Sequence, residues 1–245
     1  MVRLAALLTV AVPLALYFAF GDRLPRFSDW GDVAFLALLA LPAVFTLVWL
    51  SLPARDDVPT RVLGAAAIAL AVIAAVLHAA ELDVLANFAK LAAATALGWW
   101  FLTFFEAAWW VLIVALLIVP VDLVSVARGP TKHITEEEPQ VFDALSVFFR
   151  IPGDPSTAKL GLPDVLFFAL FVGAAVRFDL RPLATWILAT LSFGGTIVLA
   201  IWFDQAGVAA LPLLSAAFVV ANGDLLWRSI RRRRRYEEPA EDEER

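Results

Sequence analysis

The sequence predicts an all-α protein, a polytopic bundle of transmembrane helices. Of its 245 residues, 62% are hydrophobic and the mean hydropathy is +0.82, whereas a soluble domain of this length is nearer to half apolar. The excess lies in runs of about 17 to 22 residues, the length that a helix needs to cross the hydrocarbon core of a bilayer. Charged residues gather between these runs and in the C-terminal tail, so the net charge of −5 says little about partners.

We expect about eight spans, separated by short polar or turn-forming stretches. The first run begins like a signal peptide after Arg3, but it is too long for one and lacks a small-x-small cleavage site, so it is expected to be a retained span. Paired tryptophans on either side of Glu106 indicate a tight turn at the membrane interface. The expected spans are roughly residues 3–20, 31–52, 61–80, 84–104, 107–127, 161–178, 182–203 and 207–227.

These spans divide the chain into three parts. Residues 1–106 hold four N-terminal spans, and residues 107–227 hold four more together with a long loop at 128–160. In that loop "RGPTKHITEEEPQ" is charged and expected to be solvated, whereas "VFDALSVFFR" is amphipathic and fits the membrane surface or a position over a site. Residues 228–245 are predicted to be a basic stop at the membrane surface followed by a disordered acidic tail.

The distribution of lysine and arginine predicts the orientation of the chain in the membrane. With eight spans, the side that carries the run Arg231 to Arg235 holds more basic residues than the side of the long loop. Both termini are therefore expected to be cytoplasmic. Arginine outnumbers lysine and alanine is abundant, which suggests a GC-rich microbial genome and hence a prokaryotic plasma membrane.

Composition excludes several kinds of site. The chain has no cysteine, which excludes disulfides, iron–sulfur clusters and thiol nucleophiles. It has two histidines and no HExxH motif, which argues against a zinc protease. A rhomboid-type serine protease needs a facing serine and histidine, and His78 has no evident serine partner. We expect no cofactor, no metal and no nucleic-acid partner.

Ionisable side chains within spans are costly and usually mark function. Lys90 is expected to extend toward the start of its span, and His78 to be structural near a helix end. Asp224 follows an Asn-Gly pair that predicts the end of a helix, so it is expected to be interfacial. Asp122 and Asp164 differ from these, because they match each other in depth.

Asp122 lies six residues before Arg128, and Asp164 lies five residues after Lys159. At 1.5 Å per residue both lie roughly 8 Å inside the face that carries the long loop, so the two carboxylates can meet if their spans are neighbours. Such a pair is expected to hold one proton, so that one carboxylate takes a proton from water while the other donates to a carbonyl oxygen. The alternative is that each aspartate only caps a helix end, for which Asp164 after Pro163 is well placed.

Pro212 falls at the same depth in the last span. Within a helix it would free the carbonyl of Val208, and unpaired backbone at this depth persists only beside protein or a water-filled cavity. An extended peptide could pair with such backbone by strand addition. The alternative is an ordinary proline in a first or second helical turn.

The two aspartate segments resemble motifs of the presenilin and signal peptide peptidase family of intramembrane aspartyl proteases. "VDLVSV" resembles the Tyr-Asp motif of that family, with Asp122 at the aspartate and Val121 in place of tyrosine. "GLPDVLFFALFVGAA" resembles the Gly-x-Gly-Asp motif, with Gly161 and Asp164 retained and Pro163 in place of the second glycine.

A third motif follows in the order that the family has. "ALPLLS" resembles the Pro-Ala-Leu motif, with Pro212 and Leu214 retained and Leu213 in place of alanine. "TKH" at 131–133 is similar to microbial members. The resemblance covers roughly residues 107–227, where the family places its catalytic helices, although the family usually has nine spans rather than eight.

The resemblance implies a presenilin-like bundle that cleaves transmembrane helical peptides or signal-peptide remnants within the bilayer, with Asp122 and Asp164 as the catalytic pair. Small residues four apart, Ala169 and Gly173, would let the second catalytic helix pack closely. The motif and substrate-binding residues that it implies are Gly161, Leu162, Pro163, Pro212, Leu213 and Leu214.

Two other classes of function stay open from the sequence. Pro163 and Val121 also fit a protease-like scaffold that binds transmembrane helices without cleaving them. A proton-coupled transporter would use membrane carboxylates as proton relays, but such proteins often contain inverted repeats and no internal repeat is evident here. The substrate, the cleavage site and the oligomeric state are not determined by these patterns.

Overall fold

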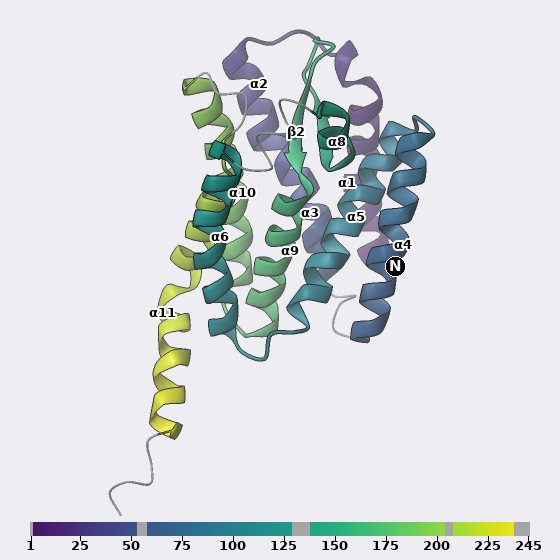
Figure 1. Cartoon of the computed structure of the whole chain (residues 1–245). Helices are drawn as coiled ribbons and strands as arrows, with labels where there is room; N and C mark the ends of the chain where they lie inside the picture. The colour runs from purple at the N-terminus through teal and green to yellow at the C-terminus, as the bar shows by residue number, and fades with distance from the viewer. Residues whose placement is uncertain (1, 53–57, 129–137, 204–207, 238–245) are drawn as a thin grey trace, which may run out of the picture.

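The computed structural model describes residues 2–52, 58–128, 138–203 and 208–237, and it confirms the predicted bundle of helices (Figure 1). Among the described residues one β-hairpin interrupts the series of helices. This hairpin was not predicted from the sequence. The elements in order are α1 (Val2–Phe20), η1 (Gly21–Arg23), α2 (Asp29–Phe35), η2 (Leu36–Ala40), α3 (Leu41–Ser51), α4 (Thr60–Ala79), α5 (Asp83–Leu102), α6 (Ala108–Arg128), α8 (Pro139–Ala144), β1 (Ser146–Arg150), β2 (Thr157–Gly161), α9 (Leu162–Arg177), α10 (Pro182–Trp202) and α11 (Leu211–Glu237).

Seven helical segments among the described residues are long and apolar enough to cross a membrane, which indicates a multi-pass membrane protein. They are α1, the continuous segment α2–η2–α3, α4, α5, α6, α10 and α11. The remaining expected span, at 161–178, is α9, which has 16 residues and is shorter than the other seven. The tight turn predicted around Glu106 joins α5 to α6.

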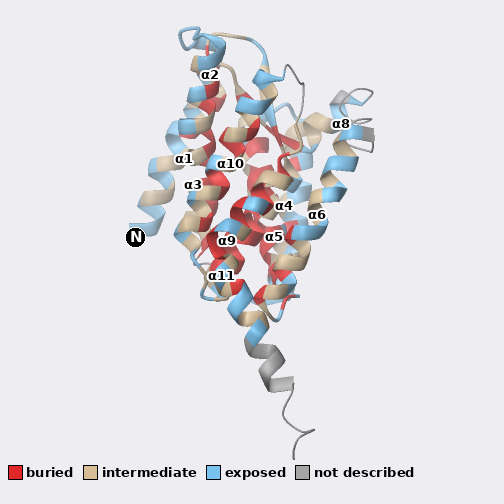
Figure 2. Cartoon of the chain, turned by 90° about the vertical axis from the view of Figure 1, so that its left-hand side faces the viewer, coloured by how far each residue is buried: buried red, intermediate tan, exposed pale blue. Residues whose placement is uncertain are grey.

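Helix α9 occupies the centre of the bundle and packs against α3, α5, α6, α10 and α11 (Figure 1). Its sequence is apolar on all sides, as expected of a helix that is surrounded by protein, and residues 168–175 are all buried. Helix α4 covers the outside of α5, and α1 packs on α3 and β1. The buried residues run along the centre of the bundle while its outer helices expose apolar side chains (Figure 2), as lipid contact requires.

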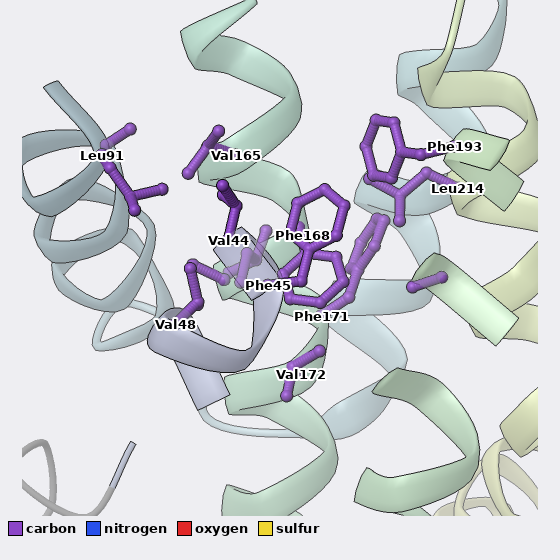
Figure 3. Close-up of a cluster of buried hydrophobic side chains, with 14 of the residues drawn as sticks. Val44, Phe45, Val48, Leu91, Val165, Phe168, Phe171, Val172, Phe193 and Leu214 are labelled. Atoms are coloured by element: carbon purple, nitrogen blue, oxygen red, sulfur yellow. The ribbon is translucent and has the colours of Figure 1, made fainter. Parts of the chain in front are cut away.

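Stacked phenylalanines join the central helix to its neighbours (Figure 3). The rings of Phe45 and Phe168 have centroids 4.0 Å apart and link α3 to α9. The rings of Phe171 and Phe218 are 4.7 Å apart and link α9 to α11. All four side chains are fully buried, so these pairs fix where α9 lies between α3 and α11.

Replacing Phe168 by alanine is expected to lower the free energy of unfolding by roughly 2 kcal/mol. Lipid tails are as apolar as the core, so lost packing and the remaining cavity account for the effect, and it is smaller than for a soluble protein. Unfolding in mixed detergent micelles measures it. The control is Leu191→Ala on the lipid-facing surface of α10, where the side chain is 55% exposed; an equal loss in both variants would contradict the central position of Phe168.

Helices α5 and α9 are in close contact at Gly98. A Cβ atom at this position would lie 2.4 Å from the carbonyl oxygen of Leu166 and 3.1 Å from the Cβ of Ala169. Ala169 therefore lies at a close helix contact, as the sequence analysis expected, and Gly98 is the partner that it did not single out. Gly173 is also buried on α9.

The structure adds detail to one loop prediction and corrects one prediction near the end of the last span. The segment "VFDALSVFFR", expected at the membrane surface or over a site, is divided between α8, which ends at Ala144, and β1, which begins at Ser146. The Asn222–Gly223 pair does not end a helix, since α11 continues through it to Glu237; the buried amide of Asn222 donates to the Thr185 hydroxyl instead. "TKH" at 131–133 and the acidic residues 238–245 lie outside the described residues.

Candidate active site

Asp122 lies near the C-terminal end of α6, two residues after Pro120. Its side chain is half-buried, and its Oδ2 accepts a hydrogen bond from the backbone N–H of Leu211 at 3.1 Å. Val121 points away from this contact and is 63% exposed. The carboxylate of Asp122 is thus directed into the bundle while its neighbour faces the outer surface.

Leu211 is the first residue of α11, so its N–H is one of the donors that a helix start leaves without an intrahelical partner. The positive end of the helix dipole also lies here and favours a negative charge. The contact therefore joins α6 to α11 and places a carboxylate where its charge is favoured.

Asp164 lies in the first turn of α9, directly after the hairpin. Gly161 is the residue that caps this helix, and Pro163 occupies a first-turn position where the missing N–H of proline costs nothing. The carboxylate of Asp164 turns back and accepts a hydrogen bond from the Gly161 amide, as the third residue of a capping box does. Asp164 is therefore also a capping residue in the first turn of its helix, which is the alternative to a catalytic role that the sequence left open.

A side chain at position 161 would crowd the carboxylate. The Cβ of any residue there would lie 3.2 Å from Asp164 Oδ2, closer than ordinary van der Waals contact. Gly161 thus leaves room around the carboxylate, which gives a physical reason for glycine at the start of the "GLPD" motif.

The structure places Asp122 and Asp164 on helices that contact each other. Asp122 on α6 and Asp164 on α9 lie close enough for their charges to interact, and the Leu211 amide binds Asp122 from α11. Three segments that are far apart in the sequence thus meet at one level of the bundle. The arrangement offers two half-buried carboxylates, a pairing that suits general acid–base chemistry on a bound water molecule.

Pro212 does not interrupt the last helix, and the alternative considered from the sequence, an ordinary proline in a first helical turn, is the one that the structure bears out. Helix α11 begins at Leu211, so Pro212 stands in the first turn, and residues 208–210 before it are neither helix nor strand. The irregular backbone that the sequence analysis sought at Val208 precedes the helix rather than interrupting it. Leu214 is fully buried in the core (Figure 3), whereas Leu213, Pro212 and, at the start of α9, Leu162 are half-buried.

The hairpin that leads to Asp164 is held along the outer edge of β1. Strands β1 and β2 are antiparallel, with Phe148 opposite Lys159. On the edge of β1 that faces away from β2, the side chain of Asn87 donates to the Phe148 carbonyl at 2.9 Å and accepts from its N–H at 3.2 Å. Lys90 donates to the Ser146 carbonyl and Tyr17 to the Arg150 carbonyl.

Side chains from α5 and α1 therefore occupy the edge of β1, and the other edge of the hairpin belongs to β2. The sheet has two strands among the described residues, so no third strand pairs with β2 there. In an antiparallel ladder the peptide groups alternate between the two edges, so those of Thr157 and Lys159 point outward from the sheet. This open edge runs directly into Gly161 and Asp164.

Replacing Asn87 by leucine is expected to destabilise the hairpin by about 2 kcal/mol, because both peptide groups of Phe148 lose their partner in a buried setting. Hydrogen exchange of residues 146–150 and 157–161 should become faster. Gln140→Leu on the exposed face of α8 serves as the control. Unchanged exchange in the Asn87 variant would show that the side chain does not hold β1.

The other ionisable candidates lie away from the carboxylate pair. Lys90 does extend toward the start of α5, but its side chain is 4% exposed and donates to backbone carbonyl oxygens of α8 and β1. Asp224 forms a bidentate ion pair with Arg181, at 2.6 and 2.8 Å, beside the start of α10. His78 lines a polar cavity next to the hairpin.

The sequence analysis missed the Leu211 amide, Gly98, Asn87 and the hairpin. Proline at the second position of α11 was a usable signal for a helix start, and "IPGDP" between two β-prone stretches was a usable signal for a hairpin turn. The roles of Gly98 and Asn87 depend on which helices are neighbours, for which one sequence offers no local signal.

No family model matches the chain, and no curated protein or solved structure is similar enough to it to indicate a relationship. The function is therefore inferred from the geometry of the three motifs.

Proposed function

We propose that this chain is a presenilin-like intramembrane aspartyl protease, which cleaves transmembrane segments or signal-peptide remnants. The observation that carries the proposal is the convergence of Asp122, Asp164 and the Leu211 amide from three separate helices. In this reading all eight expected segments cross the membrane, with α9 as a short central span. The excess of arginine near the C-terminal end favours a cytoplasmic C-terminus in a prokaryotic plasma membrane.

The chemistry needs only the two carboxylates and water. A pair that shares one proton holds a water molecule between its oxygens; the ionised member takes a proton from the water as its oxygen attacks the peptide carbonyl carbon. The protonated member donates its proton to the carbonyl oxygen, which gives a neutral gem-diol. In the collapse the protonated carboxyl donates its proton to the amide nitrogen, the ionised carboxylate takes a proton from a hydroxyl of the gem-diol, and the C–N bond breaks, so the pair again holds one proton. The pair titrates as a unit, so neither aspartate has a fixed role.

The open edge of β2 offers a place for the substrate. A helix must unwind before its peptide bonds can reach a protease site, and an unwound segment needs partners for its freed backbone groups. The peptide groups of Thr157 and Lys159 can supply these by strand addition, a few residues before Asp164. Residues 208–210 before α11 offer further irregular backbone beside Asp122.

Pro163 and Val121 depart from the motifs of the family and motivated the scaffold alternative, but both fit a catalytic site. Pro163 occupies a first-turn position that tolerates proline, and it leaves the Asp164 carboxylate beside Gly161. Val121 is on the exposed face of α6, so a hydroxyl at this position would not point at the carboxylate pair. These observations support catalysis over binding alone.

Cleavage of single-span peptides by the purified protein in proteoliposomes tests the proposal. Mass spectrometry of the products should place the cut within the membrane segment of the peptide. The variant with both Asp122→Asn and Asp164→Asn should bind the same peptides without cutting them. Binding with no cleavage by the unaltered protein at any pH would favour the scaffold, and pH-driven solute uptake into the same vesicles would favour a transporter.

A further inference from the structure

A polar cavity of about 210 Å³ lies between the hairpin and the ends of α4 and α5. It is separate from the carboxylate pair, since neither Asp122 nor Asp164 lines it. Its charged and titratable lining consists of His78, Asp83, Lys90, Asp143, Arg150 and Lys159.

Two regular patterns build this lining. Asp83, Asn87 and Lys90 are spaced along one face of α5. On the hairpin, Phe148 and Lys159 are direct cross-strand partners and therefore lie on the same face of the sheet. The apolar residues next to them along each strand point to the opposite face, where Val147, Phe149 and Leu160 are buried in the core. The hairpin thus separates an apolar core from a polar cavity.

Lys90 is a buried cation in the wall of this cavity. Its Nζ donates to the carbonyl oxygens of Asp143 at 2.5 Å and Ser146 at 3.1 Å. An ammonium group has three donors, so these two bonds leave one. The carboxylate of Asp143 pairs with Lys159 instead, and no ion pair to Lys90 occurs among residues 2–52, 58–128, 138–203 and 208–237. Asp143 and Asp83 act on the Lys90 charge from a distance, without an ion pair to it, so the remaining donor of the ammonium group is what an anion in the cavity would bind.

The cavity lies at the level of lipid head groups. His78 is in the last turn of α4 and Asp83 is the first residue of α5, and both helices are long and apolar enough to span the membrane. Lys90, Arg150 and Lys159 outnumber the two aspartates of the lining, so the cavity favours an anion. The anion that every phospholipid presents at this level is its phosphate group.

We propose that this cavity binds the phosphate of a phospholipid head group. The phosphate accepts a hydrogen bond from the remaining N–H of Lys90. It also accepts charge-assisted hydrogen bonds from Lys159 and Arg150 at the rim of the cavity. Because Lys90 belongs to α5 and the other two to the hairpin, the bound lipid holds the hairpin against α5. The inference concerns binding alone and does not depend on proteolysis.

Lipid binding to the purified protein in detergent tests the proposal, with native mass spectrometry and thermal unfolding as the measurements. Added phosphatidylglycerol should be retained and should raise the Tm, whereas diacylglycerol with the same acyl chains should do neither. Lys159→Gln, which keeps a hydrogen-bonding group at the rim, should weaken phosphatidylglycerol binding about tenfold. Arg26→Gln is the matched control, because Arg26 is also paired with an aspartate, Asp154, but lies outside the cavity.

Three results would overturn the proposal. Equal affinities of the Lys159→Gln and Arg26→Gln variants would mean that the cavity does not bind the lipid. Equal retention of diacylglycerol would mean that acyl chains rather than phosphate are recognised. If inorganic phosphate raises the Tm through Lys159 while phosphatidylglycerol does not, the cavity serves a soluble phosphate and not a lipid.

Discussion

Replacing either Asp122 or Asp164 by asparagine is expected to lower the rate of peptide cleavage by at least about 10³-fold. Asparagine cannot take a proton from water, and one carboxylate alone cannot serve as both acid and base. Because the two carboxylates act as a unit, the double variant should be no slower than either single variant. Cleavage of a single-span peptide in proteoliposomes measures all three rates.

These substitutions should leave the fold intact. The amide oxygen of an asparagine at position 122 can still accept the hydrogen bond from the Leu211 N–H, and the side chain has the same size. The control is Asp224→Asn, which removes an aspartate from the same helix bundle but about 20 Å along α11 from Leu211. A single variant that keeps a tenth of the activity or more would mean that the pair is not the catalytic centre.

Replacing Gly98 by valine is expected to separate α5 from α9 and to abolish cleavage. Even the Cβ atom of alanine would lie 2.4 Å from the Leu166 carbonyl oxygen, and this atom belongs to the backbone and cannot move alone. Leu166 is two residues from Asp164, so a shift of α9 moves the catalytic carboxylate. We expect the free energy of unfolding to fall by about 3 kcal/mol, the upper end for overpacked cores.

Gly195→Ala is the matched control, because a Cβ on this α10 glycine has nothing within 4 Å. Alanine there should leave activity unchanged and stabilise the helix slightly. The measurements are the Tm in detergent and the cleavage rate. A Gly98→Val protein with the Tm and activity of the unaltered chain would contradict the close approach of α5 and α9.

Hydropathy was sufficient to predict where most helices lie, because lipid and buried core impose the same demand for apolar residues over about 20 positions. It did not separate α9 from the other spans, although α9 is shorter and surrounded by protein. The hairpin was missed because its strands have five residues each, too few for the period of the apolar pattern to distinguish a strand from a short helix. The continuation of α11 past Asn222 depends on a tertiary contact that a single sequence does not contain, whereas Pro212 was a local signal for a helix start that was not used.

For the site, charged residues at the ends of the spans led to the prediction that Asp122 and Asp164 lie at similar depth. Which helices are neighbours was only an assumption at that stage, and the contact between Leu211 and Asp122 depends on it. Motif analysis does not detect side chains that hydrogen-bond to the backbone, such as Asn87 of α5, which binds β1. Such side chains recognise peptide groups rather than particular residues.

The most direct test of the carboxylate pair needs no known substrate. A photoreactive hydroxyethylene compound mimics the tetrahedral intermediate of aspartyl proteolysis, and such analogues bind far more tightly than substrates. We predict that it labels the purified protein and the Asp224→Asn and Pro163→Gly variants, and that Asp122→Asn and Asp164→Asn each abolish labelling. Equal labelling of the two asparagine variants and the unaltered protein, or no labelling of any of them, would contradict a formed catalytic pair.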